Sequence, residues 1–186
     1  MNLPNTLTIF RVLLIPAFVI LIIHRSFGWA MAVFAIAGLT DGLDGLLARL
    51  TGRKTELGAY LDPIADKLLL ISSYLSLAIV EILPDWLAVI VITRDVIILL
   101  GILVISLISR PPAIRPSFVS KVTTVFQILT VLVALMAGYN PLFQQLTPIA
   151  ISLTTFLTIL SGIHYIFLGT RFLNQKSHPP RKGESP

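Results

Sequence analysis

Six apolar segments, each long enough to cross a lipid bilayer as a helix, make up most of this chain. A spanning helix needs about 20 apolar residues, and the polar stretches between the segments are too short to hold a second domain. We expect helices over six ranges: 7–23, 29–50, 58–82, 86–108, 118–136 and 148–168. The sequence therefore predicts an all-α, polytopic membrane protein built as a bundle of six transmembrane helices.

The composition supports this location. Of 186 residues, 55% are hydrophobic and 12% are charged, with a mean hydropathy of +0.90, whereas a soluble domain carries about 25% charged residues. The absence of cysteine excludes disulfides, thiolate metal sites and cysteine nucleophiles. The first apolar segment has no basic region before it and no small-residue cleavage site, so we expect no cleavable signal peptide.

The basic residues predict the orientation of the bundle. Lysines and arginines gather in the second and fourth connections and after the last segment, whereas the opposite connections carry Arg25, Glu81 and Asp85. Because basic loops stay in the cytoplasm, we expect both termini and the 41–66 region to face the cytoplasm, across the inner membrane if the cell is bacterial. The charge is not concentrated on one helix face, so no nucleic-acid partner is expected. We expect one transmembrane domain, 1–172, and a polar, disordered tail, 173–186.

Four aspartates interrupt the second and third apolar segments. Among the nine acidic residues of the chain, these four lie in one stretch: Asp41, Asp44, Asp62 and Asp66. The first pair is spaced i, i+3 and the second i, i+4, so each pair shares one face of a helix. Ionisable groups inside or at the edge of a membrane are costly and are by default functional. The short connection between the two segments predicts antiparallel helices with both pairs at one depth.

The four carboxylates predict a metal site. In one small volume they would repel each other unless cations neutralise them. An oxygen-only set of donors suits a hard divalent cation, so we expect one or two Mg²⁺ or Mn²⁺ ions as cofactors.

The residues around the aspartates suggest what the metal would bind. Gly38, Gly42 and Gly45 form a stripe that another backbone or a flat ligand can approach closely, and Arg49 lies on the same rim. A metal site beside an arginine and a bare backbone suits a ligand with a pyrophosphate group. The alternative is that the glycines only pack helices and that the aspartates pair with Lys67, Arg49 or Arg94.

The same stretch resembles the motif of the CDP-alcohol phosphatidyltransferase family. The pattern is D-x-x-D-G-x-x-A-R, eight further residues, and G-x-x-x-D-x-x-x-D, and the chain matches every fixed position. The resemblance implies two metal ions, held by the four aspartates on the diphosphate of CDP-diacylglycerol. It implies that Asp66 is also the general base, and that four residues line the pocket for the cytidine and phosphates: Gly45, Ala48, Arg49 and Gly58. CMP would be released, and the family suggests a homodimer.

Cations elsewhere in the chain predict an anionic alcohol acceptor. Arg94 lies deep in the fourth apolar segment, and Arg115 and Lys121 lie at the start of the fifth; cations aimed at one cavity would bind a phosphate. Alternatively, Arg94 pairs with Asp95 or with an active-site aspartate, and Arg115 is an ordinary cytoplasmic loop residue. Arg11 either snorkels to the interface or faces the site.

Two branches of the family use such an acceptor. The stretches FAIAGLTDGLDG, ITRDVIILL and RPSFVSKVTTVFQ look more like the CMP-forming cardiolipin synthases, whose acceptor is phosphatidylglycerol. Enzymes that use glycerol-3-phosphate more commonly carry Arg-Glu on the fourth helix and a further arginine two turns later, where this chain has Asp95 and Ile102. The resemblance therefore favours phosphatidylglycerol, with glycerol-3-phosphate as the alternative.

Three other classes of membrane protein fit the sequence less well. A divalent-cation transporter places acids near the midplane of the bilayer, often in a repeated architecture, whereas these aspartates gather at one edge and no repeat is visible. An intramembrane prenyltransferase is generally larger and carries two separated acidic motifs. A non-catalytic scaffold has no need for four carboxylates in this arrangement.

Overall fold

The computed structural model describes the backbone of residues 3–51, 56–108 and 118–177, and the side chains of residues 9–40, 65, 67–101, 118–168 and 170. The elements it describes are all helices: α1 Leu3–Ile23, α2 Phe27–Thr51, α3 Glu56–Ile79, α4 Asp85–Ile108, α5 Phe118–Met136 and α6 Pro141–Ser177. The predicted all-α class is confirmed. Among the described residues, 118–136 and 141–168 are long and apolar enough to cross a membrane, and Ile9–Ile23, Phe27–Thr40 and Lys67–Ile79 form shorter apolar helices.

The bounds expected for the last helix are wrong at both ends. α6 begins at Pro141 rather than at residue 148 and continues to Ser177, beyond residue 168 and into the segment expected to be a tail. Proline is tolerated in the first turn because the backbone N–H it lacks would have no partner there. The Asn140 side chain caps the turn by accepting a hydrogen bond from the Leu142 backbone N–H at 2.9 Å. Pro148 lies inside the helix without ending it.

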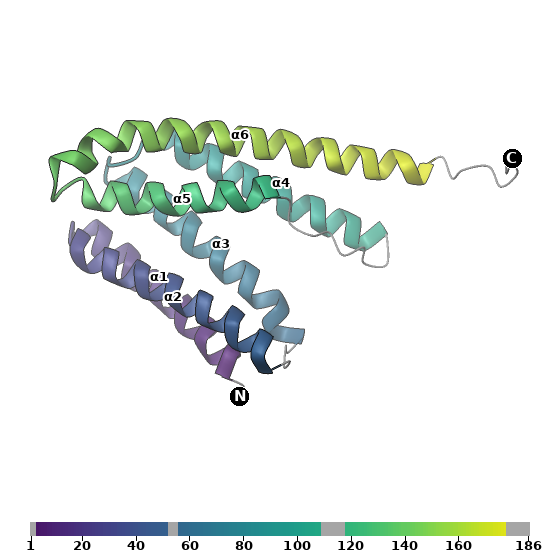
Figure 1. Ribbon diagram of the computed structural model, residues 1–186, viewed down its shortest axis with the longest axis horizontal. Coiled ribbons are helices and arrows are strands. Elements are labelled where there is room, and N and C mark those ends of the chain that lie inside the picture. The colour runs from purple at the N-terminus through teal and green to yellow at the C-terminus, as the bar shows by residue number, and fades with distance from the viewer. Residues whose placement is uncertain (1–2, 52–55, 109–117, 178–186) are drawn as a thin grey trace, which may run out of the picture.

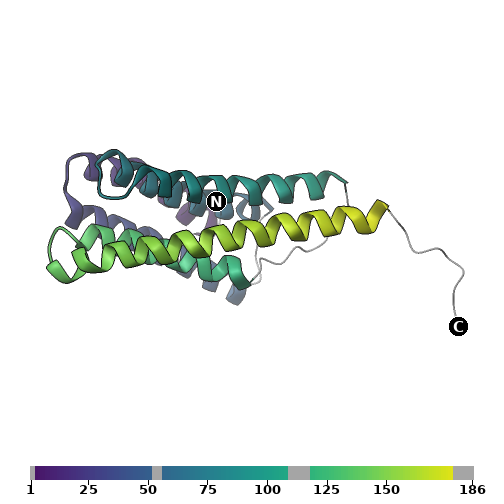
Figure 2. The same ribbon diagram turned by 90° about the horizontal axis from the view of Figure 1, so that it is seen from above.

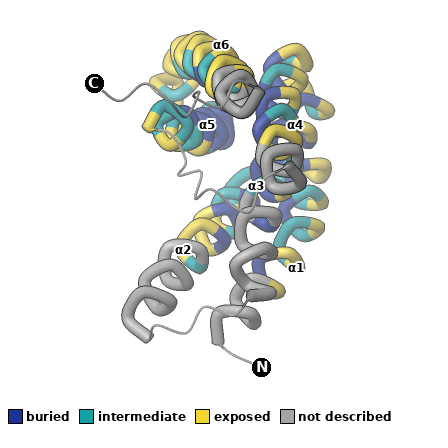
Figure 3. Tube along the Cα trace, turned by 90° about the vertical axis from the view of Figure 1, so that its right-hand side faces the viewer, coloured by how far each residue is buried: buried dark blue, intermediate teal, exposed yellow. Residues whose placement is uncertain are grey.

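The bundle has an N-terminal half, α1–α3, and a C-terminal half, α4–α6. α1 packs against α2 and α3, while α6 packs against α4 and α5; α3 contacts α4 and α5, and α2 contacts α5. Figure 1 shows the two halves converging at the end where α2 begins, with α1, α2 and α3 diverging from α5 and α6 toward the other end. Buried positions line the surfaces where helices meet, and the outward surfaces are exposed (Figure 3).

The interface between α5 and α6 is polar. The two helices lie side by side (Figures 1 and 2). The hydroxyls of Thr130 and Thr154 are 2.7 Å apart, and Thr123 donates to the Leu157 backbone oxygen at 3.2 Å. Small hydroxyl side chains let helices approach closely where lipid offers no hydrophobic drive for association.

Among the described residues, hydrogen bonds at three levels of the bundle connect its two halves. At the converging end, the Gly28 backbone N–H donates to Tyr139 Oη at 2.7 Å. In the core, the Tyr74 hydroxyl donates to the Gln127 backbone oxygen at 3.1 Å. Toward the beginning of α3, Lys67 Nζ donates to Asp95 Oδ1 at 2.5 Å.

The turns that end α1 and α3 use the same backbone arrangement. Arg25 and Glu81 have left-handed φ values of 56° and 64°. Around Glu81, the N–H of Ile82 bonds to the Leu77 oxygen and the N–H of Glu81 to the Ala78 oxygen, each at 2.9 Å. This is a Schellman cap, which usually has glycine in the left-handed position because glycine has no Cβ.

We expect Glu81→Gly to stabilise the protein. Removing the Cβ relieves a left-handed backbone that costs a non-glycine residue about 1–2 kcal/mol, and part of that gain is lost because glycine also makes the unfolded chain more flexible. The free energy of unfolding should rise by about 0.5–1 kcal/mol, which is detected as a higher Tm in detergent micelles. Glu81→Ala is the matched control, since it removes the exposed carboxylate and keeps the Cβ. An equal rise in both variants would contradict the backbone explanation.

Candidate active site

The aspartate motif lies at the ends of α2 and α3 that the 52–55 connection joins. The pattern from Asp41 to Arg49 belongs to the C-terminal part of α2, and Gly58, Asp62 and Asp66 belong to the first turns of α3. The side chains of eight predicted site residues fall outside the described part of the chain: Asp41, Asp44, Asp62, Asp66, Gly45, Ala48, Arg49 and Gly58. Arg115 also lies outside it. Their roles stay predictions.

The chemistry of this donor set fits Mg²⁺ or Mn²⁺. The motif offers four carboxylates and no histidine or cysteine, which are the hard oxygen ligands that such cations take. Among the side chains that the structure describes, no three His, Cys, Asp or Glu residues gather as a competing metal site.

Lys67, the residue directly after Asp66, begins a buried network of charges. Its Nζ lies 2.5 Å from Asp95 Oδ1 on α4, and the two side chains are 21% and 0% exposed. Arg94 Nη1 reaches the same oxygen at 2.6 Å. One carboxylate oxygen therefore binds two cations, whereas Asp95 Oδ2 is buried with no hydrogen-bond partner in the described part of the chain.

Arg94 connects three helices. Its Nη2 donates to Ser120 Oγ on α5 at 2.6 Å and to Ser161 Oγ on α6 at 2.8 Å, and its Nε also donates to Ser161, at 3.2 Å. The guanidinium thus holds α4 against α5 and α6 through a planar, forked set of donors that a lysine cannot reproduce. The pairing of Arg94 with Asp95, one of the two interpretations of this arginine, is observed. The prediction that Arg94 also binds the acceptor stays a prediction.

We expect Arg94→Met to lower the free energy of unfolding by about 2–3 kcal/mol. Breaking a buried ion pair commonly costs about 3–5 kcal/mol, and Lys67 still neutralises part of the Asp95 charge here. Thermal unfolding in micelles measures the loss. The matched control is Arg25→Met, because Arg25 is exposed in the turn after α1 and should change stability little. A loss no larger than that of the control would contradict a structural role for Arg94.

Two further cations and two histidines lie on α1, α5 and α6 and in the turn after α1. Arg11 is fully buried, so it faces the interior of the bundle and does not snorkel. Lys121 is exposed near the beginning of α5. His24 is exposed in the turn after α1. His164 is partly buried on α6, with its ring edge-on to that of Tyr165 at a centroid distance of 6.4 Å.

Apart from the pairing of Arg94 with Asp95, sequence reasoning missed the network around Asp95. Lys67 was considered only as a partner for the aspartates, although a lysine inside an apolar helix is itself a signal of function. Ser120 and Ser161 gave no signal, because isolated serines are common in membrane helices.

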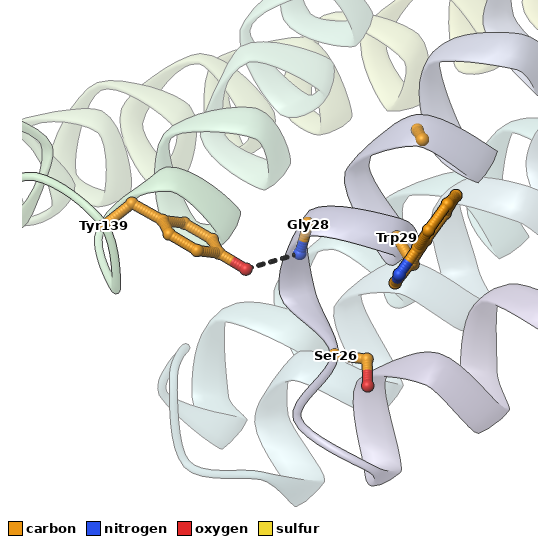
Figure 4. Close-up of a pocket in the computed structure, with 5 residues that line it drawn as sticks. Ser26, Gly28, Trp29 and Tyr139 are labelled. Carbon is orange, nitrogen blue, oxygen red and sulfur yellow. Dashed lines mark hydrogen bonds between the residues drawn. The ribbon is translucent and has the colours of Figure 1, made fainter.

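A hollow of about 450 Å³ lies at the opposite end of α2 from the motif. Ser26, Gly28, Trp29, Ala32 and Tyr139 line it (Figure 4), so it offers neither a carboxylate nor an imidazole for catalysis. A Cβ on Gly28 would lie 3.1 Å from Tyr139 Oη. The hollow belongs to the contact between the two turns and is not a candidate active site.

Comparison with known proteins decides the family. The model of the CDP-alcohol phosphatidyltransferase family matches residues 1–160, which include the whole aspartate motif. The chain belongs to the CDP-alcohol phosphatidyltransferase family. Its motif is therefore the family's motif, and the predicted resemblance is confirmed.

Relatives within this phosphatidyltransferase family carry different names. The chain is 33% identical over 190 residues to the cardiolipin synthase (CMP-forming) of Rattus norvegicus, covering 91% of this chain and 62% of that protein. It is 33% identical over 174 residues to a probable phosphatidylglycerophosphate synthase of Mycobacterium tuberculosis, covering 89% and 80%. It is 37% identical over 171 residues to the CDP-diacylglycerol–glycerol-3-phosphate 3-phosphatidyltransferase of Haemophilus influenzae, covering 89% and 91%. The match thus spans less than two thirds of the rat protein.

Proposed function

We propose that the protein transfers the phosphatidyl group of CDP-diacylglycerol to the hydroxyl of an anionic, glycerol-type acceptor and releases CMP. The observation that carries the proposal is the complete motif on the adjoining ends of α2 and α3, in a chain that the family model matches over residues 1–160. The reaction belongs to the synthesis of anionic phospholipids.

We place the enzyme in a membrane as six transmembrane helices with the motif on the cytoplasmic side. Two stretches are long and apolar enough to span on the described residues alone, and large apolar side chains such as Leu13, Val89 and Phe156 are exposed, as lipid contact requires. The basic connections support the orientation. In a bacterial cell this would be the inner membrane, with the enzyme as a homodimer.

In the proposed reaction, the acceptor oxygen attacks the phosphorus that carries the diacylglycerol. Asp66 takes the proton of the attacking hydroxyl, since an ionised carboxylate within hydrogen-bond reach can act as a general base. The bond between that phosphorus and the oxygen bridging to CMP breaks, and CMP leaves with the electron pair. Arg49 neutralises charge on the phosphates, while Gly45, Ala48 and Gly58 leave room for the nucleotide. Mg²⁺ or Mn²⁺, held by the four aspartates as two ions, would offset charge on the attacking and leaving oxygens.

We favour phosphatidylglycerol as the acceptor, which would make cardiolipin the product. Asp95 and Ile102 stand where enzymes that use glycerol-3-phosphate more commonly carry glutamate and arginine. Relatives are named for both products, so glycerol-3-phosphate is the second candidate. Arg94, Arg115 and Lys121 are the proposed acceptor-binding cations.

One assay tests both parts of the proposal. Purified protein with CDP-diacylglycerol and Mg²⁺ or Mn²⁺ is offered phosphatidylglycerol, glycerol-3-phosphate, inositol phosphate and serine in parallel reactions. Cardiolipin formed only with phosphatidylglycerol is the expected result. Phosphatidylglycerophosphate formed from glycerol-3-phosphate would reverse the choice of acceptor. No CMP release with any of the four would contradict the proposed activity.

A further inference from the structure

The charges between the two halves of the bundle do not balance within the described residues. Lys67 and Arg94 contribute two positive charges and Asp95 one negative charge, and both cations contact the same carboxylate oxygen, at 2.5 and 2.6 Å. Holding a net charge in the interior of a membrane protein is costly, so such charges mark functional positions.

The two cations differ in what they can still bind. The Arg94 side chain is 2% exposed, and its Nε, Nη1 and Nη2 atoms already donate to Ser161, Asp95 and Ser120. The Lys67 side chain is 21% exposed, and its one hydrogen bond in the described part of the chain goes to Asp95. An ammonium has three donors. Lys67 is therefore the more accessible of the two cations for a ligand.

We propose that Lys67 binds a phosphate oxygen of a substrate, and that Asp95 is a positioning residue that fixes the direction of the Lys67 ammonium. This inference rests on the proposed function, because both proposed substrates carry phosphate. The phosphate belongs either to the diphosphate of CDP-diacylglycerol or to the head group of the acceptor. Lys67 directly follows Asp66 along α3, so the proposal places this phosphate at the same turn of α3 as the proposed general base.

Asp95 can direct the Lys67 ammonium because Arg94 and two serines hold Asp95 in place. A lysine side chain has four rotatable bonds and loses much conformational entropy when it is ordered. Asp95 orders it through a charge-assisted bond of 2.5 Å. Arg94 holds the same Asp95 oxygen and is itself held by serines of α5 and α6. The direction of Lys67 on α3 thus depends on the C-terminal half of the bundle.

The first test is steady-state kinetics in which each substrate is varied separately. Lys67→Met should raise the KM of one substrate about 10- to 100-fold, the loss expected for a hydrogen bond to a charged group, and change kcat less than threefold. A higher KM for CDP-diacylglycerol identifies its diphosphate, and a higher KM for the acceptor identifies the acceptor phosphate. Lys67→Arg should recover part of the affinity. Unchanged KM values for both substrates in a folded Lys67→Met protein would overturn the proposal.

The second test separates positioning from stability. Asp95→Asn should raise the same KM about fivefold or more, because the amide still accepts a hydrogen bond but no longer attracts the ammonium. Thr154→Val is the matched control, since it breaks the buried hydroxyl contact with Thr130 and should lower Tm while leaving both KM values unchanged. If Asp95→Asn lowers Tm without changing either KM, Asp95 is not a positioning residue.

A binding measurement keeps this inference distinct from the proposed function. CDP-diacylglycerol and phosphatidylglycerol are each added to purified wild-type protein and to Lys67→Met, and the rise in Tm is recorded without turnover. One lipid should raise the Tm of the wild type and raise that of the variant less. If the wild type releases no CMP with any acceptor but this difference persists, the proposed activity fails and the phosphate site stands. Equal rises in both proteins would contradict the phosphate site.

Discussion

Asp66→Asn should lower kcat for CMP release by at least about 100-fold while the protein stays folded and still binds CDP-diacylglycerol. General-base catalysis typically contributes 10²–10⁴-fold, and an amide cannot accept the proton of the acceptor hydroxyl. The amide keeps the size of the carboxylate and one oxygen for the metal, so the largest loss should fall on kcat. Asp66 lies in α3, directly before the charged network that begins at Lys67.

Two measurements check this result. CMP release is followed under saturating concentrations of both substrates, and binding of CDP-diacylglycerol is followed by the rise in Tm that it causes. Asp85→Asn is the matched control, because Asp85 is an exposed aspartate in the first turn of α4 and should leave both measurements unchanged. Turnover at the wild-type rate in Asp66→Asn would remove Asp66 as the base.

Asp62→Ala should lose the binding and the activity that depend on divalent cations. Removing one of four carboxylates takes a ligand from the predicted site, and the remaining three offset less of the charge on a bound cation. We expect activity in Mg²⁺ or Mn²⁺ to fall by at least about 100-fold, as expected where cations stabilise charge on both sides of a displaced phosphoryl group. Asp41→Ala should behave in the same way, because Asp41 belongs to the other pair of proposed metal ligands.

The readout that does not depend on activity is the Tm measured against Mn²⁺ concentration. The wild type should gain stability as Mn²⁺ is added, whereas Asp62→Ala should gain little, and Asp85→Ala should follow the wild type. A variant that keeps metal-dependent turnover would contradict the two-metal arrangement.

Local sequence signals predicted the order of the helices and most of their bounds. They gave wrong bounds where a proline lies in a helix and where a residue other than glycine ends one. The last helix was expected to begin at Pro148, with Pro141 in the connection before it, but Pro141 lies in the first turn, where a helix needs no backbone donor, and Pro148 is accommodated inside α6. In the same way, the end of α3 at Ile79 rather than at residue 82 depends on a left-handed Glu81, and sequence patterns favour glycine at that position.

The side-chain network could not be predicted for a different reason. Lys67 and Asp95 are 28 positions apart, and Arg94 and Ser161 are 67 apart. Whether such pairs meet depends on how far each helix is rotated about its axis, and packing of the whole bundle sets that rotation. The burial of Arg11 is a case of the same kind, since its sequence neighbourhood fits either a snorkelling or an inward position.

The short turn between α3 and α4 has a mechanical consequence for how the two halves of the bundle could move. This turn joins the two halves covalently at the converging end, and the bond between Gly28 and Tyr139 fastens them at that end as well. Relative motion of the halves would therefore be a hinge motion, with the hinge at the converging end and the largest displacement at the end where α3 begins (Figure 1). In such a motion, the bond between Lys67 and Asp95, which lies toward the beginning of α3, would be strained more than the bond between Gly28 and Tyr139.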